Sequence, residues 1–300
     1  MPDPAVLLEA GAKVFLYASV LVVLGASALR WLLLPRASGE VGAPRIRLIE
    51  QGSARLALLA SVCALGSCAL RLWTHTVAAF GFADASLGNI KLMALQSRWG
   101  QGWKVQLAAA LILTIACTIT SRRRQAWPFA TLSALIFTST IPLLGHAAGN
   151  VLREALHGVH VLAAGIWLGT LAVVLTVPIP NVKPDPSARD SGRSVRLLIL
   201  RNFWLIALPS AATVAAAGVV AAYLYVGAFS NLWTTAYGRV LLIKVALVGA
   251  IGGCGFVNWR RLQQKIPSES GSLAIVLLEA LLAIAVVLVT ALLTETAHPG

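Results

Sequence analysis

Long hydrophobic runs, each separated from the next by a short polar segment, cover most of the chain. A helix needs about 20 predominantly apolar residues to cross the roughly 30 Å hydrocarbon core of a bilayer. Eight runs meet this requirement, at about 11–34, 55–81, 103–121, 127–147, 151–177, 202–227, 239–259 and 273–294. Because a helix satisfies its backbone hydrogen bonds within one segment, the pattern predicts an all-α, polytopic membrane bundle of about eight transmembrane helices.

The polar segments between the runs are short. The longest lie at 35–44, 177–186 with the polar residues that follow, and 263–272. None is long enough to form a second domain, so we expect a single integral membrane domain over residues 1–300. The segment 82–103 mixes Leu, Met, Trp, Lys and Arg, which suggests a helix lying in the membrane interface. Asp3 and Glu9 precede the first run where a basic leader would stand, so we expect no removable signal peptide.

Composition and charge support a membrane protein and suggest its orientation. Hydrophobic residues make up 58% of the chain and charged residues 12%, which leaves too little polar surface for a soluble protein. The net charge of +13 is spread over short clusters between apolar runs, so no nucleic-acid partner is expected. Of the 24 Lys and Arg residues, 16 fall at 30–55, 122–124, 183–201 and 260–265. Since basic loops are retained in the cytoplasm, both termini are expected to be extracytoplasmic.

All five histidines are expected near the outer face in this orientation. They are His75 at the end of the second run, His146 at the end of the fourth, His157 and His160 at the start of the fifth, and His298 after the eighth. His157 and His160 are three residues apart and therefore share a helical face. A short turn keeps His146 close to both.

Imidazole is the commonest side-chain metal ligand and suits copper, zinc, iron and nickel. The histidines therefore predict a metal or cofactor site near the outer face, with His75, His146, His157 and His160 as the metal ligands. The alternative is that interfacial histidines only hydrogen-bond to water and to loop carbonyl groups. For His298 this alternative is the better interpretation.

Other polar residues inside the runs allow two interpretations each. Arg71 and Lys244 either line a cavity or extend toward the interface. Glu279 and Asn258 either form part of an inner gate or pair with basic loop residues. Three cysteines fall in the inner half of the runs: Cys63, Cys117 and Cys254. They either offer soft ligands to copper(I) at a cytoplasmic exit or serve as small helix-packing residues.

Three motifs resemble the CopD family of bacterial copper-resistance membrane proteins. They are Gly145-His146-Ala147, the stretch 156–169 with its two histidines and the closing Trp-Leu-Gly, and Tyr237-Gly238-Arg239 leading into 241–244. The resemblance implies copper movement across the bacterial inner membrane, inward from the periplasm, alongside a periplasmic copper-binding partner of the CopC type. It also implies that the outer histidines bind the copper ion.

A second resemblance is to the haem-containing HemJ family. The spacing from His160 to Trp167 and the Gly-Arg-Val-Leu-Leu-Ile-Lys run that ends at Lys244 carry it. It implies that His160 and Lys244 are the axial ligands of a haem b in a membrane redox protein, since axial ligation needs two groups on facing helices. A third hypothesis is an assembly factor that delivers metal to a periplasmic oxidase.

The favoured hypothesis is a copper transporter that captures its ion at the outer histidines and passes it inward. The sequence contains no Walker motif, so transport without nucleotide hydrolysis, and no enzyme activity, is expected. The expected surroundings are the lipid bilayer of the bacterial inner membrane. No oligomeric state is assigned.

Overall fold

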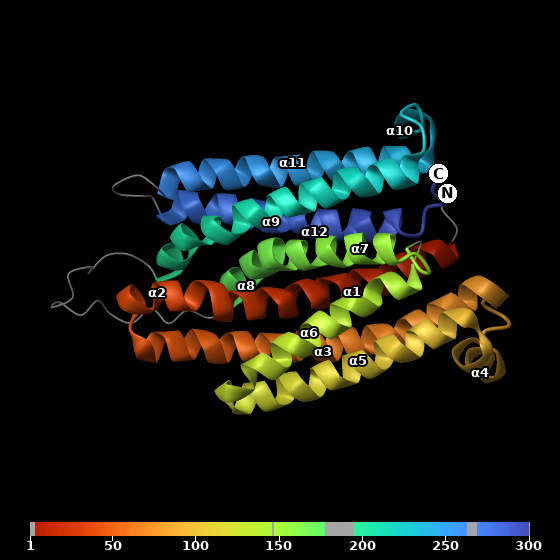
Figure 1. Ribbon diagram of the computed structural model, residues 1–300, viewed down its shortest axis with the longest axis horizontal. Helices are drawn as coiled ribbons and strands as arrows, with labels where there is room; N and C mark the ends of the chain where they lie inside the picture. Colours follow the sequence, from red (N-terminus) through yellow and green to blue (C-terminus); the bar gives the residue numbers. More distant parts are fainter. Residues whose placement is uncertain (1–3, 146, 178–194, 263–268, 300) are drawn as a thin grey trace.

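Figure 1 shows the computed structural model of the chain, which describes residues 4–145, 147–177, 195–262 and 269–299. Every regular element within these residues is helical. Eight helical segments are long and apolar enough to cross a membrane. They are Pro4–Gly39, Ala43–Phe80, Arg98–Arg122, Arg124–Leu144, Val151–Thr176, Leu198–Val226, Ala236–Arg261 and Ala274–Leu293. The predicted all-α bundle with eight membrane-spanning helices is confirmed.

The helices differ from the predicted runs mainly at their ends. Helix α3 (Ala43–Phe80) begins well before residue 55, and α5 (Arg98–Arg122) begins before residue 103. The segment 82–103 contains the short helix α4 (Leu87–Gln96) and the first turn of α5. The Ser97 hydroxyl caps α5 by accepting a hydrogen bond from the Gly100 backbone N–H at 2.8 Å. Polar residues extend a helix past the apolar run on which the prediction rests.

Three of the spans are composites of shorter elements. The first consists of α1 (Pro4–Ala28), the π-helical turn η1 (Leu29–Leu33) and α2 (Leu34–Val41). The fourth consists of η2 (Arg124–Ala126), α6 (Trp127–Thr140) and η3 (Ile141–Leu144). The fifth consists of α7 (Val151–Ala164), the π-helical turn η4 (Gly165–Gly169) and α8 (Thr170–Thr176). Such π-helical turns are rare and frequently occur at functional sites.

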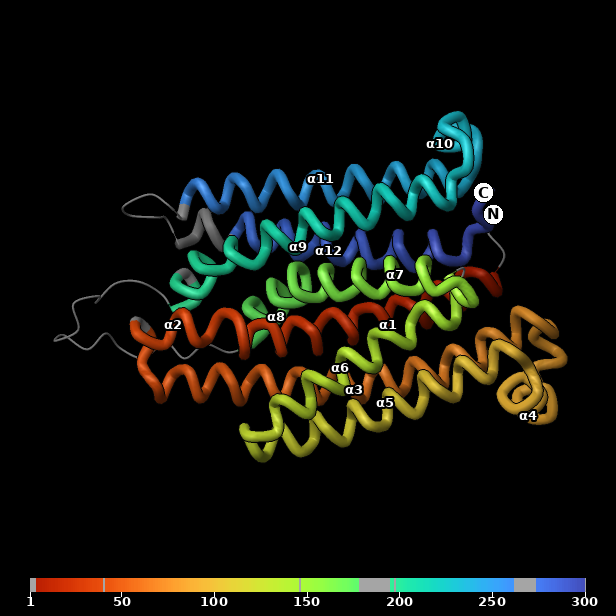
Figure 2. Tube along the Cα trace, viewed as in Figure 1, coloured from red at the N-terminus to blue at the C-terminus, as the bar shows by residue number. Residues whose placement is uncertain are grey.

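Helix α1 lies at the centre of the bundle. It contacts α3 and α6 on one side and α12 (Glu269–Leu293) and the α7–α8 segment on the other. Helix α5 packs against both α3 and α6, and α12 packs against α11 (Ala236–Leu262). Helix α9 (Val195–Val226) contacts α7, and the short α10 (Asn231–Thr234) precedes α11. Figure 2 shows the same arrangement as a tube trace.

Two glycines allow α1 to pack directly against η4. A Cβ at Gly25 would overlap the Gly169 backbone, and a Cβ at Gly169 would overlap the Leu21 carbonyl oxygen. Gly165 and Gly169 are four residues apart and so lie on one helical face, the spacing that lets two membrane helices approach closely. Part of the motif at 156–169 therefore serves helix packing.

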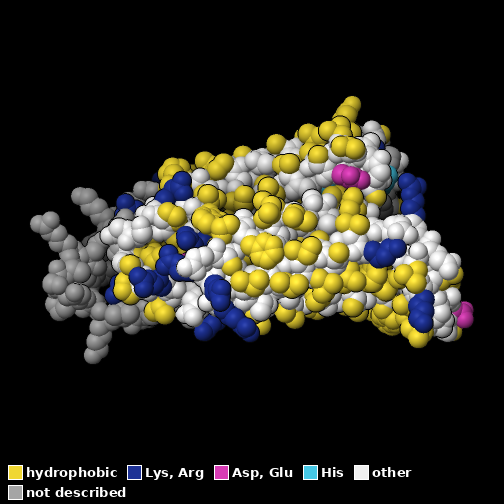
Figure 3. Space-filling model, turned by 60° about the horizontal axis from the view of Figure 1, so that its bottom comes forward, with side chains coloured by type: hydrophobic (Ala, Val, Ile, Leu, Met, Phe, Trp, Pro, Cys, Tyr) yellow, Lys and Arg dark blue, Asp and Glu magenta, His cyan; other side chains and the backbone are white. Residues whose placement is uncertain are grey.

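The two ends of the bundle differ in their charges. The described chain begins and ends at the same end of the bundle, the end that also carries α4 and α10, as expected for an even number of spans (Figure 1). On the face shown in Figure 3, Lys and Arg side chains gather toward the opposite end, and hydrophobic side chains cover most of the length between. The predicted extracytoplasmic placement of the termini stays a prediction.

Candidate functional site

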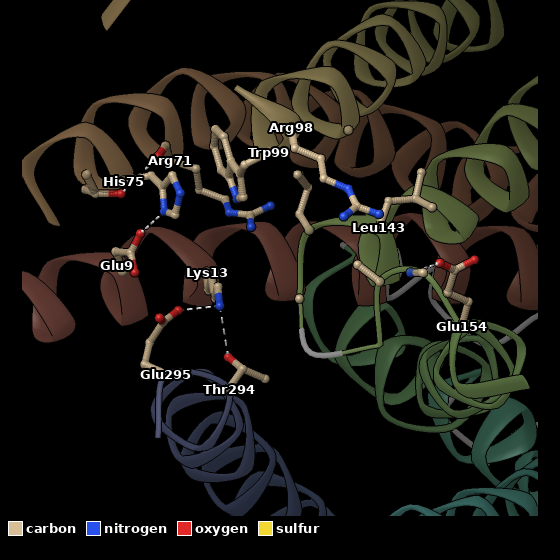
Figure 4. Close-up of a pocket in the computed structure, with 16 residues that line it drawn as sticks. Glu9, Lys13, Arg71, His75, Arg98, Trp99, Leu143, Glu154, Thr294 and Glu295 are labelled. Carbon is tan, nitrogen blue, oxygen red and sulfur yellow. Dashed lines mark hydrogen bonds and ion pairs between the residues drawn. The ribbon is translucent and has the colours of Figure 1, made fainter. Parts of the chain in front are cut away.

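A cavity of about 620 Å³ lies at the end of the bundle that carries the termini (Figure 4). Its lining comes from α1, α3, the start of α5, the η3–α7 connection, the first turn of α7 and the residues after α12. The charged or imidazole-bearing lining residues are Glu9, Lys13, Arg71, His75, Arg98, Glu154 and Glu295. Carboxylates and an imidazole thus face one polar space at a single end of the bundle.

The most informative contact in this cavity joins His75 of α3 to Glu9 of α1. The His75 Nδ1 lies 2.6 Å from the Glu9 carboxylate oxygen Oε1. The imidazole also stacks on the Trp99 ring, with the centroids 4.1 Å apart and the planes 17° apart. A carboxylate that accepts from Nδ1–H fixes the orientation of an imidazole and leaves Nε2 as the basic nitrogen, which is the usual outer-shell arrangement of a metal-bound histidine.

Lys13 and Glu295 form an ion pair beside Glu9, and the Lys13 ammonium donates to the Thr294 hydroxyl at 3.4 Å. Burial raises the pKa of the Glu295 carboxyl, while the neighbouring Lys13 opposes this change. The N-terminal helix and the segment after α12 are therefore joined through charged side chains that also line the cavity (Figure 4).

Arg71 lines the same cavity and does not extend to the interface. Its side chain is 5% exposed, and Nη1 donates to the Gln106 amide oxygen at 2.7 Å. The guanidinium carbon lies 5.9 Å from the Trp99 ring centroid. Of the two interpretations of Arg71, the structure favours a cavity-lining residue, and Trp99 packs against both Arg71 and His75.

His157 and His160 lie deeper along α7, half-buried and outside the cavity lining. His157 is one turn after Glu154, which does line the cavity. A methyl group placed at Gly218 of α9 would lie 3.7 Å from Cε1 of His160. His160 thus faces α9, the helix that α7 contacts along its length.

The predicted four-histidine site is only partly covered by the structure. His146 lies outside the described residues, although its neighbours Gly145 and Ala148 line the cavity. His298 packs near Tyr225, with ring centroids 5.2 Å apart. Within the described ranges, no three or more His, Cys, Asp or Glu side chains are grouped so that they could hold a metal ion. His75 and the α7 pair have separate surroundings there.

A further buried polar pair lies between α11 and α12. Glu279 is 4% exposed and Asn258 is 6% exposed. One side-chain oxygen of each has no hydrogen-bond partner among the described residues. The Glu279 carboxylate packs on Gly255, one turn before Asn258. The ion pairs of the described residues do not include Glu279; Lys265 of the adjoining loop lies outside those residues, so the gate and pairing interpretations both stay open.

Sequence reasoning missed Glu9, Lys13 and Glu295 as members of the site. In the sequence alone, Glu9 is only an acidic residue ahead of the first run. The available signal was a Glu and a Lys four residues apart, and so on one helical face, in an otherwise apolar segment. Glu295 gave no local signal, because only the fold brings it to Lys13.

Comparison with known protein families accounts for most of the chain. Residues 197–293 match the family described as copper resistance protein D. Residues 1–151, half of the chain, match the family described as copper resistance protein D-like, N-terminal domain. The chain belongs to the CopD family of copper-resistance proteins. The sequence-based resemblance to CopD is thereby confirmed, and the family places the chain among copper-related membrane proteins.

One curated relative is the copper transport protein CutJ of Bacillus subtilis (strain 168). It is 27% identical over 208 residues, which cover 64% of this chain and 37% of the relative. The chain therefore spans little more than a third of the length of this relative. No solved structure matches the chain.

Proposed function

We propose that this CopD-family chain carries copper ions across the bacterial inner membrane, inward from the periplasmic side, and that the ion enters through the cavity lined by His75 and Glu9. The observation that carries the proposal is the 2.6 Å contact between His75 Nδ1 and the Glu9 carboxylate. An imidazole oriented in this way offers Nε2 to a metal ion. Nitrogen and oxygen ligands together suit copper(II), whereas copper(I) prefers softer ligands.

The histidines of α7 provide the next ligands in this proposal. His157 lies one turn beyond Glu154 of the cavity wall, and His160 follows one turn later. His146, between the fourth and fifth spans, would contribute from the cavity rim. A conducted ion must bind firmly enough to enter and weakly enough to leave.

Glu279 and Asn258 support a continuation of the path toward the opposite end. An ionisable side chain buried within a membrane-spanning helix is costly and usually marks an ion or proton pathway. Both residues keep a buried side-chain oxygen unpaired among the described residues. These oxygens can replace the imidazoles as ligands for an ion on its way out.

The remaining parts of the proposal concern the surroundings of the chain. The cavity lies at the end with the termini, which the distribution of basic loops predicts to be periplasmic. A small periplasmic protein of the CopC type could therefore deliver copper there. The chain would act as a single multi-pass domain of the inner membrane, and the family names describe copper resistance and transport rather than catalysis.

The proposal is tested by copper accumulation in cells that express the protein. Replacing His157 and His160 together by Ala should abolish accumulation without lowering the amount of protein in the membrane, because the ion loses its second set of ligands. His298→Ala is the matched control, since this histidine lies at the same end among tyrosines. Accumulation that is unchanged in the double variant would remove the α7 histidines from the mechanism.

The haem hypothesis is carried by the HemJ resemblance at His160 and Lys244, which lie on α7 and α11 of the bundle. These are the two side chains that it assigns as axial ligands of haem b. An absorption spectrum of the purified protein separates the two proposals. A Soret band that disappears in the His160→Ala variant would favour a haem protein, and copper binding without such a band would favour the transporter.

A further inference from the structure

A second cavity, of about 380 Å³, lies at the end of the bundle opposite the termini. It is formed by the last turns of the first span, the start of α3 and the connection between the third and fourth spans. Its lining residues are Arg30, Leu34, Pro35, Ser38, Ala43, Ile46, Arg47, Glu50 and Arg124. Ligand-binding pockets commonly have volumes of about 300–1,000 Å³.

The depth of this cavity follows from the ends of the spans around it. The first span ends at Gly39, the second begins at Ala43, the third ends at Arg122 and the fourth begins at Arg124. The lining residues lie around the ends of the apolar runs, at about 34, 55, 121 and 127, and residues at these positions lie at the level of the lipid headgroups. The cavity therefore lies where phosphate groups of the bilayer are concentrated.

The charges in the cavity leave a clear cationic excess. Arg30 is fixed by two contacts: its Nε lies 2.8 Å from the Glu50 carboxylate, and its guanidinium carbon lies 4.8 Å from the Trp31 ring centroid. Glu50 is 5% exposed and is the only carboxylate in the lining. Arg47 and Arg124 are exposed, and no ion pair between described residues includes either of them. One carboxylate thus faces three guanidinium groups.

We propose that this cavity binds the phosphate group of an anionic phospholipid. Guanidinium groups recognise phosphate through paired N–H donors, and basic pockets between membrane helices bind acidic lipid headgroups. The apolar side chains of Leu34, Pro35 and Ile46 form part of the same lining. They suit the glycerol and acyl portions of a lipid and give nothing to a free inorganic phosphate. The site is independent of copper and of the cavity at the other end.

The test compares lipid affinities of the full chain, purified in neutral detergent, by native mass spectrometry. The probes are phosphatidylglycerol, phosphatidylcholine and inorganic phosphate. The wild type should prefer phosphatidylglycerol. Replacing Arg47 and Arg124 together by Gln should reduce that affinity roughly tenfold or more, because each basic residue near a lipid surface contributes about 1 kcal/mol of attraction. Affinity for phosphatidylcholine should not change.

Arg36 and Arg122 provide the matched control, since both are basic residues of the same end that do not line the cavity. Their double replacement by Gln should change the phosphatidylglycerol affinity less than twofold. An equal loss in the two double variants would overturn the proposal, because it would indicate attraction by the basic surface as a whole. Complete displacement of the lipid by inorganic phosphate would also overturn it, in favour of a free-phosphate site.

A third variant changes the charge in the opposite direction. Glu50→Gln removes the carboxylate that occupies Arg30 and should raise the affinity for phosphatidylglycerol severalfold. This variant tests the proposal even if the double variant of Arg47 and Arg124 fails to fold. An unchanged or lowered affinity in Glu50→Gln would contradict a phosphate held by these three arginines. Unaltered melting in phosphatidylcholine verifies the fold of each variant.

Discussion

The two ends of the bundle each hold a cavity, but the cavities differ in their balance of charge: the first has equal numbers of carboxylates and cations, and the second has an excess of cations. At the end with the termini, three carboxylates and one imidazole share the lining with Lys13, Arg71 and Arg98. At the opposite end, three arginines face a single carboxylate. The first combination suits a metal cation and the second an anion. The ligand class that suits each cavity therefore follows from the local numbers of carboxylates and cationic side chains, and less from the net charge of the whole chain.

Both cavities depend on the first span. Its helix α1 provides Glu9 and Lys13 to one cavity, and the elements that follow it, η1 and α2, line the other. The close contact between Gly25 of α1 and Gly169 of η4 holds this helix in place. Disturbing that contact should therefore affect both ends at once.

The largest effect is expected for Gly169→Ala, because the added methyl group would overlap the Leu21 carbonyl oxygen of α1. Overpacking of this kind costs roughly 1–3 kcal/mol or more. Thermal unfolding of the detergent-purified protein measures the change. Gly158→Ala on the same span is the control, since a methyl group there meets no atom within 4 Å. Equal melting of the two variants would contradict the role assigned to the contact.

A smaller effect, limited to one end, is expected for Glu9→Gln. Loss of the carboxylate that orients a metal-binding histidine typically lowers metal affinity 10–100-fold. Copper titration of the purified protein should show a loss in this range for Glu9→Gln and no loss for Glu50→Gln, the buried carboxylate of the opposite end. Equal copper affinities in the two variants would remove the distinction between the ends.

The spans could be predicted from sequence because hydrophobic length alone determines whether a helix crosses the bilayer. The ends of the spans could not be predicted, because Arg98 and Arg124 begin helical segments several residues before the apolar runs start. The π-helical turns at Leu29–Leu33 and Gly165–Gly169 also left no mark in the hydrophobic pattern. They follow from packing between helices, which a single sequence does not display.

The candidate site could be predicted only in part for a similar reason. His75 was assigned to the outer end from its position in the second run, and the structure places it in a cavity beside the termini. Its partner Glu9 lies 66 residues away in the sequence. Arg47 and Arg124 likewise meet only after folding. Contacts between distant residues require the arrangement of the helices, and periodicity gives no information about them.

The central claim, capture of copper by the cavity at the termini, is tested most directly by X-ray absorption spectroscopy of the copper-loaded protein. The wild type should show imidazole nitrogen in the first coordination shell. His75→Ala should lose one imidazole and lower the bound copper, because His75 is the imidazole of this cavity. A copper spectrum and stoichiometry identical in the wild type and His75→Ala would contradict the proposed entry site.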